Sequence, residues 1–192
     1  MQNSRSGNLD FIGGKMKSAV VVIDVQSILF DPEPQPFEAK QVLNRINHIT
    51  ESARAKSVPV IFVQHEQADS AIEYGSEGWA LQSSLVTESG DHFVRKTSPD
   101  SFLNTELQSL LTELGVERLI VCGYATEFCV DSTVRRAAGL GYPVILVSDA
   151  HTTHDKPHAS GELIRAHHNF ALSSISSFPG KTTAVKTTDL WQ

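Results

Sequence analysis

The sequence predicts one α/β domain with three layers, in which helices cover both faces of a mostly parallel six-stranded sheet. Three observations indicate this class. Short apolar runs alternate along the chain with stretches whose apolar residues have helical spacing. Several of these runs end on polar or charged residues, which is typical of the carboxyl edge of a parallel sheet. No repeat or interdomain linker interrupts this order in the 192 residues, a length that fits one domain.

The first half of the chain predicts three strands and one long helix. The strands are expected at 19–23, 58–63 and 92–96. The first two are continuous apolar runs, which are typical of strands covered on both faces. Three prolines keep residues 31–36 out of a helix, and residues 37–56 then carry apolar residues three and four apart. The stretch after Gln64-His65-Glu66, up to Gly90, predicts a long active-site loop that contains a short helix.

The second half predicts three more strands, separated by helices. The strands are expected at 119–122, 144–147 and 183–186, and the helices at 103–115, 126–140 and 157–172. Gly115 follows the last leucine of the first of these helices, as glycine commonly does at a helix end. Pro143 and the glycines before it stop the second helix. Strands that alternate with helices in this way imply right-handed crossovers.

Composition excludes some classes of partner. The net charge is −6 and the pI is near 5.7, and no cluster of five or more Lys or Arg occurs, so no nucleic-acid or membrane partner is expected. The two cysteines are seven residues apart, which matches no disulfide framework or zinc motif. We therefore expect a cytoplasmic protein. Residues 1–15 are polar and Gly-rich and are expected to be an extension, with the domain at 16–192.

The turn after the fourth predicted strand places Cys129 in the first turn of a helix. Free N–H groups and the helix dipole at such a position favour a thiolate. Asp24 and Lys96 also stand at the carboxyl ends of predicted strands, so all three side chains are expected to face one crevice. A carboxylate that accepts the thiol proton and an ammonium that stabilises the thiolate together suit acyl transfer.

Four motifs resemble one known family: Val22-Ile-Asp24-Val-Gln26, Lys96 with Ser101-Phe102, Gly123-Tyr-Ala-Thr-Glu-Phe-Cys129-Val130, and Asp149-Ala150. They resemble the isochorismatase-like cysteine hydrolases over residues 17–186. The resemblance implies an isochorismatase-like, Rossmann-like fold with Asp24 as general base, Lys96 as its charged partner and Cys129 as nucleophile. It also implies a cis peptide between Tyr124 and Ala125, an oxyanion hole formed by the Ala125 and Cys129 N–H groups, and a homo-oligomer.

Two departures narrow the resemblance. Metal-binding nicotinamidases carry an Asp-x-His motif after the second strand, whereas this chain has Gln64-His65-Glu66-Gln67, so we expect no metal and no other cofactor. Isochorismatase itself lacks the nucleophilic cysteine, so Cys129 favours amide cleavage. The segments His65-Glu66 and Gly75 to Trp79 resemble the metal-free branch of the family, which includes streptothricin hydrolase, more than they resemble the metal-binding nicotinamidases.

Other side chains allow either a functional or a structural interpretation. The substrate pocket is predicted to include six residues: Gln26, Phe30, His65, Trp79, Phe102 and Phe128. The aromatic residues could instead belong to the core, and Cys122 is interpreted as a packing thiol. Thr126 is predicted to cap the helix, and Glu127 to complement its dipole. A solvated surface or subunit contact is favoured over a metal site for five histidines: His151, His154, His158, His167 and His168.

The leading hypothesis is therefore a metal-independent amidase that cleaves a C–N bond of a small molecule through an acyl-thioester. Two alternatives remain open. One is vinyl-ether hydrolysis of the isochorismatase type. The other is a non-catalytic member that binds a small metabolite or senses oxidants through Cys129.

Overall fold

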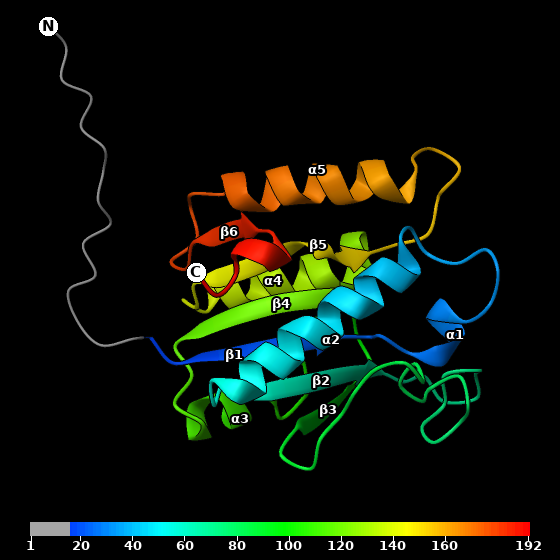
Figure 1. The fold of residues 1–192 in the computed structure, drawn as a ribbon, viewed down its shortest axis with the longest axis horizontal. Helices are drawn as coiled ribbons and strands as arrows, with labels where there is room; N and C mark the ends of the chain where they lie inside the picture. The colour runs from blue at the N-terminus through cyan, green and yellow to red at the C-terminus, as the bar shows by residue number, and fades with distance from the viewer. Residues whose placement is uncertain (1–15) are drawn as a thin grey trace, which may run out of the picture.

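The computed structural model describes residues 16–192, and the predicted extension 1–15 lies outside the described residues. One sheet of six parallel strands, in the order β3-β2-β1-β4-β5-β6, forms the middle layer (Figure 1). The strands are β1 (Ser18–Ile23), β2 (Val60–His65), β3 (His92–Lys96), β4 (Arg118–Tyr124), β5 (Val144–Thr152) and β6 (Thr182–Val185). The predicted α/β class is confirmed, and the sheet is parallel throughout.

Helices cover both faces of this sheet. They are α1 (Ser27–Phe30), α2 (Ala39–Ala55), α3 (Leu107–Glu113), α4 (Asp131–Gly139) and α5 (Gly161–Ser174), with a π-helical segment η1 (Thr126–Val130) and a 3₁₀ turn η2 (Thr187–Asp189). Figure 1 shows α2 crossing one face, with α4 behind β4. Side chains of α2 pack into one apolar core, and those of α3, α4 and α5 into the other.

The apolar runs form strands because both of their faces are buried. All six residues of β1 are buried, and alternate residues point into opposite cores: Val21 and Ile23 into one, Val20 and Val22 into the other. β1 pairs with β2 on one side and β4 on the other, so it lies inside the sheet. The residues that follow β1 therefore lie at the middle of the carboxyl edge of the sheet.

The structure corrects several predicted boundaries. Residues 66–91 contain turns, irregular backbone and one isolated β-bridge, between Leu81 and Gln26, so the prediction of a short helix there is wrong. A short helix, α1, occurs instead at Ser27–Phe30. β5 continues five residues beyond the predicted end, from Val147 to Thr152. The helix expected from Thr126 begins as the π-helical segment η1 and becomes α-helical only at Asp131.

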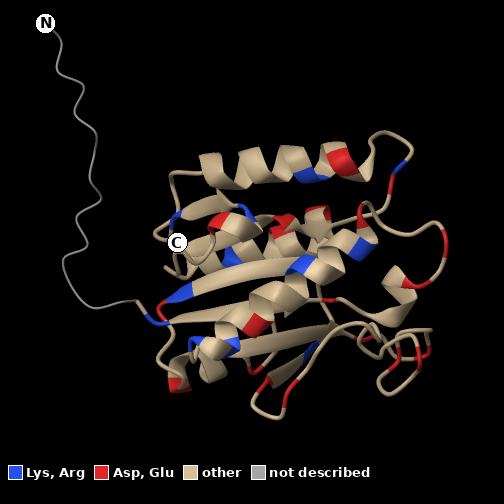
Figure 2. Cartoon of the chain, viewed as in Figure 1, with Lys and Arg blue, Asp and Glu red and all other residues tan. Residues whose placement is uncertain are grey.

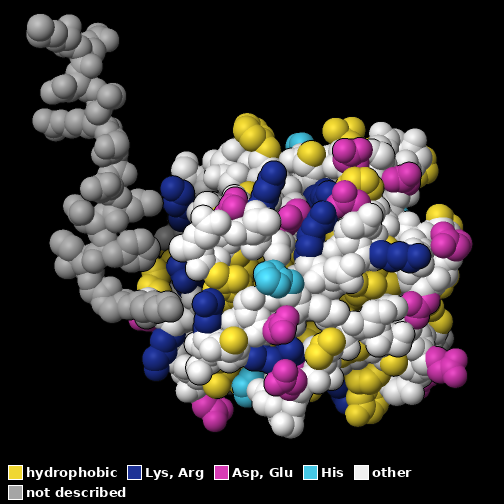
Figure 3. All heavy atoms as spheres, in the orientation of Figure 1, with side chains coloured by type: hydrophobic (Ala, Val, Ile, Leu, Met, Phe, Trp, Pro, Cys, Tyr) yellow, Lys and Arg dark blue, Asp and Glu magenta, His cyan; other side chains and the backbone are white. Residues whose placement is uncertain are grey.

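Charge is dispersed over the molecule. Figure 2 shows Lys and Arg spread over several helices, strands and loops, and Figure 3 shows both signs of charge interspersed on one face. Among residues 16–192, no helix is both long and apolar enough to cross a bilayer.

Candidate active site

Four chemically active side chains meet at the carboxyl edge of the sheet. Asp24 follows β1, His65 ends β2, Lys96 ends β3 and Cys129 lies in η1 just after β4. These strands are neighbours in the sheet, so the parallel ladder brings their ends together. The side chains that the sequence analysis placed in one crevice are therefore adjacent.

The Lys96 ammonium is at the centre of this group. Its Nζ donates to Asp24 Oδ2 at 2.7 Å, to His65 Nδ1 at 3.0 Å and to Cys129 Sγ at 3.2 Å. The side chains of Lys96 and Asp24 are 0% and 2% exposed. An isolated buried ammonium would cost several kcal/mol, and these three acceptors offset that cost. The arrangement places a proton acceptor and a cation directly beside the sulfur.

Unusual backbone conformations at Asp24 and Gly123 bring the Asp24 side chain and the turn that carries Cys129 together. Asp24 has a φ of 50°, in the left-handed region, where Asp is among the few side chains found regularly. Gly123, beside Ile23 in the β1–β4 ladder, has a φ of 120°, and a Cβ there would lie 2.1 Å from the Ile23 carbonyl oxygen. Only glycine lets the two strand ends approach this closely, which brings the Cys129 turn to Asp24.

The resting Cys129 thiol is protonated at neutral pH. Burial, followed by the Asp24 charge, raises the pKa of Cys129 to about 12, while the Lys96 charge acts in the opposite direction. The start of a helix favours a thiolate, as predicted for Cys129, but desolvation outweighs that effect here. The sulfur therefore needs a base, and a carboxylate oxygen of Asp24 lies within 4.8 Å of it. Among the residues that the structure describes, Asp24 Oδ1 is buried and has no hydrogen-bond partner.

His65 belongs to the charged centre, which the sequence analysis did not foresee. It was predicted only as a pocket residue. Burial, followed by the Lys96 charge, lowers the pKa of His65, so the neutral ring accepts from Lys96 through Nδ1. The available signal was its place at the end of β2, between the strands that end near Asp24 and at Lys96.

The same cluster has a donor set that could suit a metal. Asp24, His65 and Cys129 each offer one ligand atom, and these atoms lie within 4.8 Å of one another. However, Lys96 Nζ is hydrogen-bonded to all three side chains. Because a cation already lies among these ligands, a metal ion would have to displace the ammonium. The residues present do not fit a metal, and the absence of one stays a prediction.

The turn that carries Cys129 also carries the backbone groups expected to bind an oxyanion. The Tyr124–Ala125 peptide bond is cis. Within the described part of the chain, the Ala125 N–H has no backbone or side-chain acceptor, while the Ala125 carbonyl accepts from the Phe128 and Val130 N–H groups. A free N–H beside the nucleophile suits an oxyanion hole.

The predicted pocket residues occupy different environments. Gln26 is fully buried; its Nε2 donates to the His65 and Trp79 carbonyls, and its Oε1 accepts from the His65 N–H. Phe30 and Phe102 are 1% and 7% exposed within the two cores, so they have little surface to offer a substrate. Trp79 is half-buried and packs edge-on against Tyr74. Phe128 is 54% exposed.

The expected solvated surface holds for part of the histidines that follow the fifth predicted strand: His158 and His167 are exposed and line one surface pocket with His168, whereas His151 is buried. His151 is fully buried and bonds through Nδ1 to Thr126 Oγ1 at 2.9 Å. Thr126 makes no capping bond, so its predicted N-cap role is wrong. His154 Nδ1 lies 2.7 Å from the Tyr124 hydroxyl. The His167 and His168 rings meet edge-on with centroids 5.3 Å apart; His158 is exposed, as expected.

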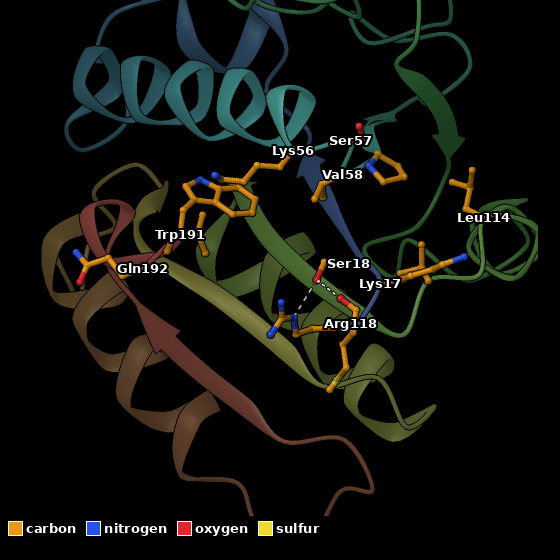
Figure 4. Close-up of a pocket in the computed structure, with 13 residues that line it drawn as sticks. Lys17, Ser18, Lys56, Ser57, Val58, Leu114, Arg118, Trp191 and Gln192 are labelled. Carbon is orange, nitrogen blue, oxygen red and sulfur yellow. Dashed lines mark hydrogen bonds between the residues drawn. The ribbon is translucent and has the colours of Figure 1, made fainter. Parts of the chain in front are cut away.

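A cavity of about 440 Å³ lies at the other end of the sheet. Figure 4 shows it beside Lys56, Trp191 and Arg118, near the start of β1. Because ligands of open parallel sheets bind at the carboxyl ends of the strands, we place the candidate site at Asp24, Lys96 and Cys129 rather than at this cavity.

Known proteins resemble this chain throughout the domain. The isochorismatase domain model matches residues 18–176. A streptothricin hydrolase of Streptomyces noursei is 37% identical over 142 residues, which are 73% of this chain and 51% of that protein. A ureidoacrylate amidohydrolase of Azorhizobium caulinodans is 29% identical over 171 residues, covering 70% of this chain and 75% of that protein.

A solved structure of an isochorismatase family protein superposes with a TM-score of 0.81 at 35% identity, covering 88% of this chain and 98% of that one. The chain spans about half the length of the streptothricin hydrolases it matches. The family model, the fold and the match to the solved structure agree: this chain belongs to the isochorismatase family.

Proposed function

We propose that the chain is a metal-independent cysteine hydrolase that cleaves a C–N amide bond of a small molecule. The observation that carries the proposal is the buried Lys96 ammonium, which bridges the Asp24 carboxylate and the Cys129 sulfur. A base and a cation that both contact a thiol are the components that nucleophilic acyl transfer requires.

The first half-reaction forms a thioester. Asp24 takes the thiol proton, and the Lys96 ammonium stabilises the thiolate as it attacks the amide carbonyl. The Ala125 and Cys129 N–H groups donate to the oxyanion of the tetrahedral intermediate. When the intermediate collapses, the C–N bond breaks and the proton held by Asp24 passes to the leaving nitrogen, so the amine departs neutral.

The second half-reaction restores the enzyme. Asp24 accepts a proton from water, which attacks the thioester carbonyl. The C–S bond then breaks, the sulfur recovers the proton from Asp24, and the carboxylic acid leaves. Over the cycle one amide and one water give one acid and one amine, with no other reactant.

The relatives support an amide as the substrate. Streptothricin hydrolase and ureidoacrylate amidohydrolase are both named as hydrolases, the second explicitly of an amide. We therefore expect a small carboxamide, ureido or lactam carbonyl, with the loop of residues 66–91 contributing to its selection.

The test compares the two cysteines on a panel of small amides, with ammonia or amine release as the readout. Cys129→Ala is expected to lower turnover to background, because no other group can form the thioester. Cys122→Ala is the matched control: Cys122 is fully buried within β4, and burial raises its pKa to about 12, so this variant should retain activity. Wild-type turnover by Cys129→Ala would refute the proposal.

A further inference from the structure

A chain of hydrogen bonds lies behind the turn that carries Cys129. Thr126 Oγ1 is 2.9 Å from His151 Nδ1, and His151 Nε2 is 2.9 Å from Asn169 Oδ1. Asn169 Nδ2 in turn donates to the Ser148 carbonyl at 2.9 Å. Thr126 and His151 are both fully buried, so none of these bonds competes with water at the histidine or the threonine.

The direction of each bond follows from the Asn169 amide. Because Nδ2 donates to the Ser148 carbonyl, Oδ1 is the acceptor, and His151 must carry its proton on Nε2. Burial lowers the pKa of His151 to about 4, so the ring is neutral at pH 7 and Nδ1 is an acceptor. The Thr126 hydroxyl is therefore the donor, and the chain runs from Thr126 through His151 to Asn169.

This chain connects three elements at the nucleophile turn. Asn169 is on α5, and His151 is near the end of β5, opposite Gly123 in the β4–β5 ladder. The ladder shifts register between Val121 and Gly123, and this irregularity is what places His151 beside the turn. Thr126 is the residue between Ala125, with its free N–H, and the part of η1 that holds Cys129.

Packing alone does not account for a polar trio in this place. Three apolar side chains could fill the same space without the cost of burying polar atoms. The directed bonds instead fix the Thr126 side chain, and with it the backbone on both sides, in a single orientation. None of the three side chains contacts Lys96, Asp24 or Cys129 through a hydrogen bond.

We propose that Thr126, His151 and Asn169 are positioning residues for the cysteine chemistry: they hold the Ala125 N–H and Cys129 in the geometry that thiol attack requires. The proposal rests on the proposed hydrolase function. A misplacement of the turn would leave substrate binding largely intact but slow the attack, because a shift of about 1 Å at reacting groups can cost about 100-fold in rate.

p-Nitrophenyl acetate isolates this step. Its leaving group needs no proton, so the release of p-nitrophenolate in the first turnover, before the thioester is hydrolysed, reports attack by Cys129 and stabilisation of the oxyanion alone. Thr126→Val keeps the shape of the side chain and removes the hydroxyl. We expect acylation at saturating ester to slow roughly 10- to 100-fold, with little change in the half-saturating ester concentration. Thr126→Ser, which keeps the hydroxyl, should remain within about threefold of wild type.

The matched control is Thr50→Val. Thr50 is also fully buried, and its hydroxyl donates to the Asn47 carbonyl on α2, away from the turn. This variant should acylate at the wild-type rate. Each variant is first shown to be folded by its urea unfolding transition. If Thr126→Val does not fold, Asn169→Ala, which removes the acceptor of His151 Nε2, is expected to slow acylation in the same range.

The outcomes separate the two proposals. Wild-type acylation by Thr126→Val, or an equal loss in Thr50→Val, would overturn the positioning role. Failure of Thr126→Ser to recover the rate would also overturn it, because the hydroxyl would then not be the group that matters. If Cys129→Ala released p-nitrophenolate as fast as wild type, the hydrolase mechanism itself would fail instead.

Discussion

At the scale of single residues, the centre of the site is a lysine rather than the cysteine. Lys96 contacts an anion, a neutral ring and a thiol, and each responds differently to pH. Because His65 accepts from the ammonium only while it is neutral, its protonation would place a second cation beside Lys96. The protonation state of His65 therefore controls the charge around the sulfur.

This coupling predicts the acid side of the activity profile. Burial and the Lys96 charge hold the pKa of His65 below its ordinary value of 6.5, so the ring is neutral at pH 7 and becomes charged only at lower pH. We expect kcat/KM to fall as His65 protonates. His65→Asn keeps an acceptor near the position of Nδ1 but does not titrate, so its acid limb should move to lower pH.

His92→Asn is the control, because His92 begins β3 at the other edge of the sheet. It should leave the profile unchanged. A pH profile of kcat/KM in His65→Asn that coincides with wild type would show that a group other than His65 sets the acid limb.

The proximity of Asp24, Lys96 and Cys129 could be predicted from the sequence, because the carboxyl ends of parallel strands meet at one edge of the sheet. This holds whatever direction the side chains take. The geometry of the three is now described, and their catalytic roles stay predictions. The contacts of His65 and His151 were beyond that reasoning. They depend on which face a residue takes at the end of a strand and on the irregular register of β5, and neither leaves a periodic signal in the sequence.

At the scale of elements, the approach of β4 to β1 is the constraint that shapes the site. Gly123→Ala should destabilise the fold by more than about 3 kcal/mol, because the new Cβ would meet the Ile23 backbone and the φ of 120° is unfavourable for alanine. Urea unfolding measures this effect.

Gly90→Ala is the matched control. A Cβ at Gly90 would meet nothing within 4 Å, so the free energy of unfolding should stay close to that of wild type. Equal stability of the two variants would mean that β1 and β4 can separate without cost, and the close approach would then not be a constraint.

The strands were predictable at this scale because burial on both faces leaves continuous apolar runs. The segment 66–91 was not, because side-chain and backbone hydrogen bonds hold it rather than any periodic apolar face. Arg54, for example, bonds Asp91 through two nitrogens and the Val86 carbonyl through one, which ties the loop to α2.

At the scale of the whole molecule, His151 links stability to pH. Its pKa is about 4 in the folded protein against 6.5 when exposed, so the unfolded chain binds the proton more readily between these values. The contribution of the neutral, buried His151 to the free energy of unfolding is fully present above pH 6.5 and is lost as the pH falls toward 4. It amounts to about 3 kcal/mol.

The free energy of unfolding, measured in urea between pH 7 and pH 4, should therefore fall less steeply in His151→Asn than in wild type. The difference in slope should approach one proton near pH 5. His158→Asn serves as the control, since His158 is exposed. Parallel slopes in His151→Asn and wild type would show that the buried ring keeps its ordinary affinity for protons.

The expected homo-oligomer stays a prediction, which light scattering of the purified chain would test. So does the division into an extension at 1–15 and a domain at 16–192.

The contacts of Gln26 and Gln64 have a consequence for how a protein of this fold could diversify. Both amides bind the main-chain carbonyl of Trp79, which any amino acid provides. At Trp79 the attachment of the loop is thus indifferent to the side chain displayed there, while the reactive groups lie at the carboxyl ends of the strands. Mutation or engineered replacement of loop residues could therefore change which compounds bind, without changing Asp24, Lys96 or Cys129.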